Sequence, residues 1–187
     1  MIAGWDWCVT HKNDYPNHPI MVISTSFGGD RHFGSCDTAT PGMTAAAQAA
    51  VAAGITVFVS SGNDGYCDSI SWPACISSVI SVGAVWDASL GTLGSCVTLD
   101  SCASLSPYAG CSTGYIAWDP TAPDRVTSYS NVASFLDVFA PSHNAYTTMV
   151  GGGYDITFGG TSAACPYAAG AAAVVQEAAY TVQGSYL

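Results

Sequence analysis

The sequence predicts an α/β protein with three layers, in which a mostly parallel sheet lies between two layers of helices. Residues 20–26 and 55–61 are continuous β-prone runs that are rich in apolar and β-branched residues, as expected for strands that are covered on both faces. Between them, residues 43–53 form an alanine-rich segment. A strand, a helix and a second strand at this spacing form a right-handed unit with parallel strands. A second alanine-rich segment, residues 159–175, predicts a helix near the end of the chain.

The first half of the chain predicts two helices. Residues 2–11 place four apolar side chains on one helical face, namely Ile2, Trp5, Cys8 and Val9. The second helix is preceded by Thr40 and Pro41, which are residue types typical of an N-cap and of the first helical position. Gly54 is expected to end it.

The second half predicts further strands and one irregular segment. Residues 79–85 and 135–141 are expected to extend the sheet, and residues 154–158 to form a short strand before the last helix. Residues 86–125 contain turn residues throughout and three cysteines, which predicts a loop-like insertion stapled by disulfides. No repeat or linker divides the chain, so residues 1–187 are expected to belong to one domain.

The composition excludes several classes of function. The chain has 13 acidic and only three basic residues, a net charge of −10, which argues against nucleic-acid binding. No apolar run approaches the 18 or so residues of a membrane-spanning helix. Eight cysteines without a C-x-x-C pair favour disulfides in an oxidising compartment over a zinc site. We therefore expect a secreted protein, whose signal sequence is not in this chain, because no basic and apolar leader follows Met1.

The cysteine spacing predicts one particular bridge. Cys67 and Cys75 bracket a short loop, and we expect them to form a disulfide. Cys8 and Cys165 lie in helical patterns, and we expect them to be buried free thiols.

Two polar residues stand where predicted elements begin or end. Ser162 lies near the start of the last helix, where unpaired backbone N–H groups and the helix dipole can stabilise an oxyanion. It is either a nucleophile or a residue that caps a buried alanine-rich helix. Asn63 follows a predicted strand in an Asn-Asp-Gly turn, at the sheet edge where α/β proteins bind ligands. Taken alone, Asn63 favours a simple turn residue.

Six short motifs along residues 20–176 resemble those of the subtilisin-like serine peptidases, the subtilases. Gly160-Thr161-Ser162-Ala163-Ala164-Cys165-Pro166 is similar to their nucleophile motif G-T-S-x-A-x-P, with Tyr167 in place of the usual His or Phe. The other five motifs stand in the family's order, at residues 22–28, 59–65, 82–85, 128–131 and 136–141. The ordered set is far more specific than any one motif.

The resemblance implies a serine endopeptidase that acts on peptide or protein substrates and requires no cofactor. Ser162 would attack the scissile carbonyl, and its own N–H and the side-chain amide of Asn63 would hold the oxyanion. The resemblance also implies two substrate-binding segments: Ser26, Phe27 and Gly28, and Ser60, Ser61 and Gly62. The first would pair with an extended peptide, and the second would form a wall of the pocket for the P1 side chain, which precedes the scissile bond. These walls suggest a hydrophobic or broad P1 preference.

The resemblance to proteinase-K-like members also suggests a weak structural calcium site. Its ligands would be the backbone of Ser77 and Val79 and the carboxylate of Asp137. The alternative is that Asp137 only caps a strand end or accepts hydrogen bonds from backbone amides.

The chain departs from the subtilase pattern at the groups that activate the serine. A serine hydroxyl is a poor nucleophile without a base. Subtilases supply an Asp from D-[ST]-G and a His from H-G-T-H, and neither motif is present. We expect all four histidines to lie on the surface, namely His11, His18, His32 and His143. The chain is therefore expected to be the C-terminal part of a longer catalytic domain, to be inactive alone, and to have the missing N-terminal part as its partner.

Other functions remain open. The main alternative is a non-catalytic peptide-binding protein, a pseudoenzyme, on the same fold. An α/β-hydrolase esterase fits less well, because Ala164 stands where its G-x-S-x-G motif requires glycine. A sedolisin, which shares the G-T-S pattern, would have an Asp where Asn63 stands.

Overall fold

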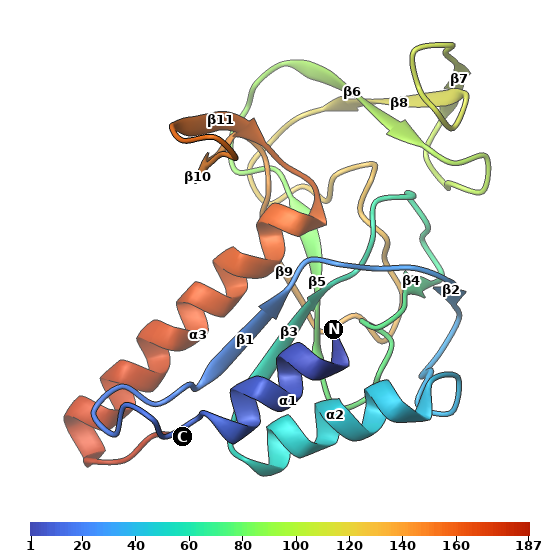
Figure 1. Ribbon diagram of the computed structural model, residues 1–187. Coiled ribbons are helices and arrows are strands. Elements are labelled where there is room, and N and C mark those ends of the chain that lie inside the picture. Colours follow the sequence, from blue (N-terminus) through green and yellow to red (C-terminus); the bar gives the residue numbers. More distant parts are fainter.

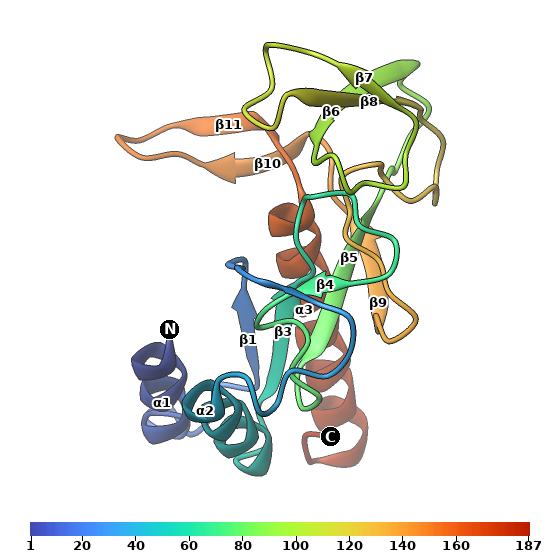
Figure 2. The same cartoon turned by 90° about the vertical axis from the view of Figure 1, so that its right-hand side faces the viewer.

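The computed structural model describes all 187 residues. Its centre is a sheet of four strands in the order β1-β3-β5-β9 (Figure 1, Figure 2). The strands are β1 (Val22–Thr25), β3 (Thr56–Ser60), β5 (Ile80–Val85) and β9 (Val138–Pro141). Each of the three pairings between them is parallel. The predicted parallel sheet is confirmed, with each strand shorter than its apolar run.

Helices cover both faces of this sheet (Figure 1). The three helices are α1 (Ile2–Thr10), α2 (Pro41–Ala52) and α3 (Thr161–Gln183). Successive residues of β3 point to opposite faces, as they must in a strand. Val57 and Val59 join the core formed with α1 and α2, whereas Phe58 joins the core formed with α3. The predicted three-layer α/β fold is therefore confirmed.

The two terminal helices bury less than expected. Trp5 is the only buried residue of α1, and Ile2, which we expected on the buried face, is 43% exposed. α3 continues past residue 175 to Gln183. Several apolar side chains in its second half are exposed, namely Val174, Val175, Tyr180 and Val182. No helix of the protein has both the length and the apolar character needed to cross a membrane.

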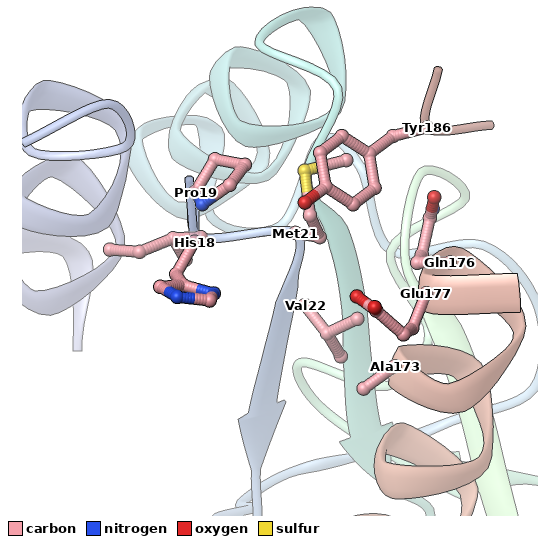
Figure 3. Close-up of a pocket in the computed structure, with 9 residues that line it drawn as sticks. His18, Pro19, Met21, Val22, Ala173, Gln176, Glu177 and Tyr186 are labelled. Atoms are coloured by element: carbon pink, nitrogen blue, oxygen red, sulfur yellow. The ribbon is translucent and has the colours of Figure 1, made fainter. Parts of the chain in front are cut away.

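The β1 side of the sheet is open. β1 pairs only with β3, so its other edge has no neighbouring strand. A hollow of about 400 Å³ lies beside this edge. Figure 3 shows Pro19 and Met21, which precede β1, on one side of the hollow, and Ala173 and Glu177 of α3 on the other. Exposed apolar residues and an unpaired edge on the same side of the sheet are typical of a surface that another segment covers.

The expectation that residues 86–125 are loop-like is wrong. They contain an antiparallel sheet in the order β6-β8-β7 (Figure 2). Its strands are β6 (Thr92–Val97), β7 (Leu105–Pro107) and β8 (Tyr115–Pro120). Small residues concealed the strand pattern of β6. A Cβ at Gly94 would lie 2.7 Å from the Ile116 side chain, so the packing of the two strands requires glycine at this position. In the sequence alone, the same glycine indicates a turn.

Two smaller sheets complete the fold. β2 (Arg31–His32) pairs with β4 (Ile70–Ser71), and β10 (Ala145–Thr148) pairs with β11 (Tyr154–Phe158). The predicted strand at residues 154–158 is confirmed as β11, whereas β10 was not expected.

The disulfides join cysteines that lie 15 to 39 residues apart in the sequence. The three bridges are Cys36–Cys75, Cys67–Cys102 and Cys96–Cys111. The predicted Cys67–Cys75 bridge is therefore wrong. The chain between these two cysteines is extended in β4, which carries them apart and places Cys75 beside Cys36. Cys8 and Cys165 are free as predicted, although Cys8 is only half-buried.

Candidate active site

Ser162 is the second residue of α3, beside the carboxyl ends of the central strands. Because α3 begins at Thr161, the N–H of Ser162 is among the first four donors of the helix, which have no intrahelical acceptor. Gly160, just before the helix, has a φ of +80°, a conformation that glycine adopts at little cost. The chain therefore turns sharply into the helix and leaves Ser162 half-exposed at its start.

Pro166 leaves the carbonyl of Ser162 without a helical donor. Proline has no N–H, so the i−4 carbonyl, here that of Ser162, loses its usual partner. The hydroxyl of Ser26 donates to this oxygen at 2.8 Å. Ser26 directly follows β1, so this bond joins the expected substrate-binding segment to the expected nucleophile.

The side-chain amide of Asn63 is held through its oxygen. Asn63 Oδ1 accepts hydrogen bonds from the backbone N–H of Thr161 at 2.8 Å and from its hydroxyl at 3.0 Å. The same hydroxyl accepts a hydrogen bond from the N–H of Gly62 at 3.2 Å. A Cβ at Gly160 would lie 3.2 Å from the Asn63 amide, so the close approach also requires glycine there. With its oxygen engaged, Asn63 has its NH₂ group available to donate.

A polar cavity of about 230 Å³ joins these groups. Six of the residues assigned from the sequence line it: Ser162, Asn63, Ser26, Gly28, Ser60 and Gly62. The remaining two assigned residues do not. Phe27 is 61% exposed, and Ser61 is fully buried with its hydroxyl donating to the carbonyl of Asn131 at 2.8 Å. The fold therefore brings together two chain segments and a helix start that lie far apart in sequence.

Sequence reasoning missed Asn131, the buried residue that organises the wall of this cavity. Its Oδ1 accepts hydrogen bonds from the backbone N–H groups of Asp64 at 2.9 Å and Tyr66 at 3.2 Å. Its Nδ2 donates to the Asp64 carboxylate at 3.0 Å and to the Ser71 hydroxyl at 3.2 Å. Its backbone N–H donates to the carbonyl of Gly62 at 3.0 Å. The only sequence signal was its position at the end of one of the six matched motifs.

Cys165 lies near the nucleophile but is not a second one. Its thiol is buried against the Ser24 hydroxyl at 3.4 Å and the Thr25 carbonyl at 3.7 Å. Burial raises the pKa of the Cys165 thiol, which keeps it protonated and unreactive at neutral pH.

No histidine lines the cavity of Ser162. His143 packs edge-on against Trp86, with ring centroids 4.8 Å apart. His11 forms a 2.7 Å contact with Asp14. None of the four histidines is buried, as expected. The site can therefore position and polarise a carbonyl group, but no imidazole within the chain is placed to accept the serine proton.

The three expected calcium ligands line one cavity of about 220 Å³: Ser77, Val79 and Asp137. Oδ2 of Asp137 accepts hydrogen bonds from the N–H of Ser81 at 2.8 Å and from its hydroxyl at 2.7 Å. The carboxylate thus bonds the backbone, as the alternative interpretation expected. Its other oxygen accepts no hydrogen bond from the protein, so the donor set fits a cation held by one carboxylate and backbone carbonyls.

Comparison with known proteins identifies the family of this chain. A model of the subtilase family, the peptidases S8, matches residues 1–185. The chain belongs to the subtilase family. Serine protease AprX of Bacillus subtilis (strain 168) is 32% identical over 177 residues, which are 94% of this subtilase chain and 38% of AprX. Subtilisin-like protease 5 of Arthroderma benhamiae is 29% identical over 173 residues, which are 92% of this chain and 33% of that protein.

Two solved structures share the subtilase fold with this chain. A mutant of the protease domain of PatA has a TM-score of 0.63 and 20% identity, and the match covers 97% of this chain and 52% of that structure. The prenylagaramide maturation protease PagA has a TM-score of 0.62 and 20% identity, with 97% and 50% covered. This subtilase chain thus spans about half of these two structures and a smaller share of the two curated relatives.

Proposed function

We propose that this subtilase chain provides the nucleophile, the oxyanion hole and part of the peptide-binding cleft of a secreted serine endopeptidase. The observation that carries the proposal is the amide of Asn63, whose oxygen is engaged by Thr161 and whose NH₂ is free on the cavity that Ser162 lines. The three disulfides support an oxidising, extracytoplasmic location.

The chemistry follows from these positions. Ser162 Oγ bonds to the scissile carbonyl carbon, and the electron pair of the C=O bond moves to the carbonyl oxygen. The N–H of Ser162 and the NH₂ of Asn63 donate to this oxyanion, and their donation strengthens as negative charge develops. The backbone of the substrate lies along Ser26, Phe27 and Gly28 as an added strand. The proton of the serine hydroxyl must pass to a base.

A histidine and an aspartate from outside this chain are proposed to supply that base. They would belong to a preceding segment of the same domain, in the order Asp, His, Ser that this family uses. The free edge of β1, the hollow beside it and the exposed apolar residues of α3 support a segment packed on this side. Without it, the chain alone is proposed to be inactive.

The test compares the chain with a longer product of the same gene. Turnover of a fluorogenic peptide is expected in the longer product and is lost in its Ser162→Ala variant. The chain alone should turn over about 10⁶-fold more slowly, as expected for loss of the catalytic histidine. Asn63→Ala in the longer product should lower kcat by about 10²–10³-fold, the cost of one oxyanion donor. Ordinary turnover by the chain alone, lost in Ser162→Ala, would overturn the requirement for an external base.

A peptide-binding pseudoenzyme is the second candidate, and the lack of a histidine on the cavity favours it. It predicts that the longer product binds peptides at this cavity and has no turnover. The upstream gene sequence separates the two candidates, because only the peptidase needs D-[ST]-G and H-G-T-H.

We also propose a weak structural calcium site at Ser77, Val79 and Asp137. No cofactor is proposed for the reaction itself. Calcium at 100 times its Kd should stabilise the protein by about 2.7 kcal/mol. A rise in Tm with calcium but not magnesium is expected, and Asp137→Asn should abolish it, whereas the exposed Asp6→Asn should not. An equal calcium response in Asp137→Asn would remove this site from consideration.

A further inference from the structure

We infer that the cavity beside Ser162 selects a positively charged P1 side chain, lysine or arginine, through the carboxylate of Asp64. This inference rests on the proposed function, because it assigns a substrate class to the same cleft. The first observation is that the cavity is polar: ten residues line it and none of them is hydrophobic. An apolar P1 side chain would gain little by entering, since the hydrophobic gain comes from apolar contact area and the polar walls would lose water.

The second observation is the fixed orientation of the Asp64 carboxylate. The backbone N–H and the Oδ2 of Asp64 are both hydrogen-bonded to the buried side chain of Asn131, at 2.9 and 3.0 Å. The carbonyl of Asp64 accepts hydrogen bonds from the N–H of Thr98 at 3.0 Å and its hydroxyl at 3.1 Å. The half-buried carboxylate is therefore held in place before any ligand arrives, which lowers the cost of ordering it on binding.

The third observation is that no cation of the chain neutralises this carboxylate. Asp64 takes part in none of the ion pairs, which involve His11 and Arg31. Arg31 contacts two other acids, Asp68 at 2.7 Å and Asp100 at 3.1 Å. Lys12 donates to backbone carbonyls at the end of α2. The Asp64 carboxylate is thus partly withdrawn from water and has no cationic partner in the free protein. Such a carboxylate is well suited to bind a cationic ligand.

Glycine and serine residues keep the space in front of this carboxylate open and polar. Gly62 has a φ of +106°, and a Cβ there would lie 2.3 Å from the Ser71 hydroxyl and from the Asn131 amide. Ser71 lines the same cavity as Asp64, together with Ser60. An ammonium or guanidinium group would thus meet a carboxylate and hydroxyl acceptors, which satisfy several donors at once. A broad or hydrophobic P1 preference, expected from the sequence, does not fit these walls.

The test measures binding of peptide acids to the chain by fluorescence anisotropy. The peptides end in lysine or in norleucine, which has the same aliphatic stem without the ammonium group. We expect the lysine peptide to bind about tenfold more tightly, above the effect of a fully exposed ion pair because the carboxylate is half-buried and oriented. Asp64→Asn should remove this difference, and the exposed Asp6→Asn, with the same charge change, should preserve it. Salt at 1 M should also reduce the difference.

The outcomes separate the inference from the proposed function. Equal binding of the two peptides, or a lysine preference that survives Asp64→Asn, overturns the inference and leaves the peptidase cleft intact. Absence of binding for every peptide, together with absence of turnover in the longer gene product, contradicts the proposed function and removes the inference with it.

Discussion

Replacing Asn131 by alanine should destabilise the protein far more than a single surface substitution does. The substitution removes the acceptor of two backbone N–H groups, those of Asp64 and Tyr66. A buried donor left without a partner costs about 1–3 kcal/mol. Because these two donors belong to half-buried residues, the free energy of unfolding should fall by about 2–4 kcal/mol, the lower part of the range for two donors. For a domain of this size, a loss of about 4 kcal/mol corresponds to a fall in Tm of roughly 8–16 °C.

Urea unfolding followed by tryptophan fluorescence measures this loss, because Trp5 and Trp86 are buried and report on the two cores. Asn17→Ala is the matched control: it removes an exposed amide and should change stability by less than about 0.5 kcal/mol. If Asn131→Ala changes the free energy of unfolding by less than about 0.5 kcal/mol and leaves the m-value unchanged, the Asn131 amide does not hold this part of the cavity wall in place.

Asn131→Asp separates the acceptor from the donor role. It keeps an oxygen for the two backbone N–H groups but places a second carboxylate beside that of Asp64. Two close carboxylates raise the pKa of one of them. The native state then loses stability above that raised pKa and regains it as pH falls. Asn131→Asp should therefore approach the parent protein in stability near pH 4, whereas Asn131→Ala should remain less stable.

Three further predictions concern the rest of the chain. In the native protein, the thiol reagent DTNB should leave Cys165 unmodified, because burial covers the thiol and raises its pKa. In urea without reductant, Cys8 and Cys165 should both react with DTNB. Fast labelling of Cys165 in the native protein would contradict its burial. The N–H and hydroxyl of Ser77 donate to Asp37 and lower its pKa, so Asp37 stabilises the fold above the pKa of the unfolded chain and loses this effect as pH falls. The stability difference between the protein and Asp37→Asn, from urea titrations, should thus be larger at pH 6 than at pH 3, and a constant difference would refute it. The chain should bind ANS at the exposed apolar residues of α3, and replacing the exposed valines there with serine should lower the fluorescence.

Many of the strands and helices, and the position of Ser162, could be predicted from patterns of residues that are close together in the sequence. Runs rich in apolar residues locate the four central strands, although only β3 and β5 are buried along most of their length and β9 exposes three of its four residues. The alanine-rich segments locate two helices. The nucleophile motif places Ser162 at a helix start because Gly160 and Pro166 act on the backbone of their immediate neighbours. The same motifs carry the subtilase assignment. These properties depend on residues within a few positions of one another, so the sequence is sufficient for them.

The tertiary structure alone decided which distant segments meet. Cys75 pairs with Cys36 rather than Cys67, because β4 is extended between the two cysteines that are close in sequence. Asn131 reaches Asp64 across 67 residues, and this contact turns an ordinary Asn-Asp-Gly turn into a cavity wall with an oriented carboxylate. Local patterns carry no record of such contacts, since their geometry arises only when the sheet and its loops are packed together.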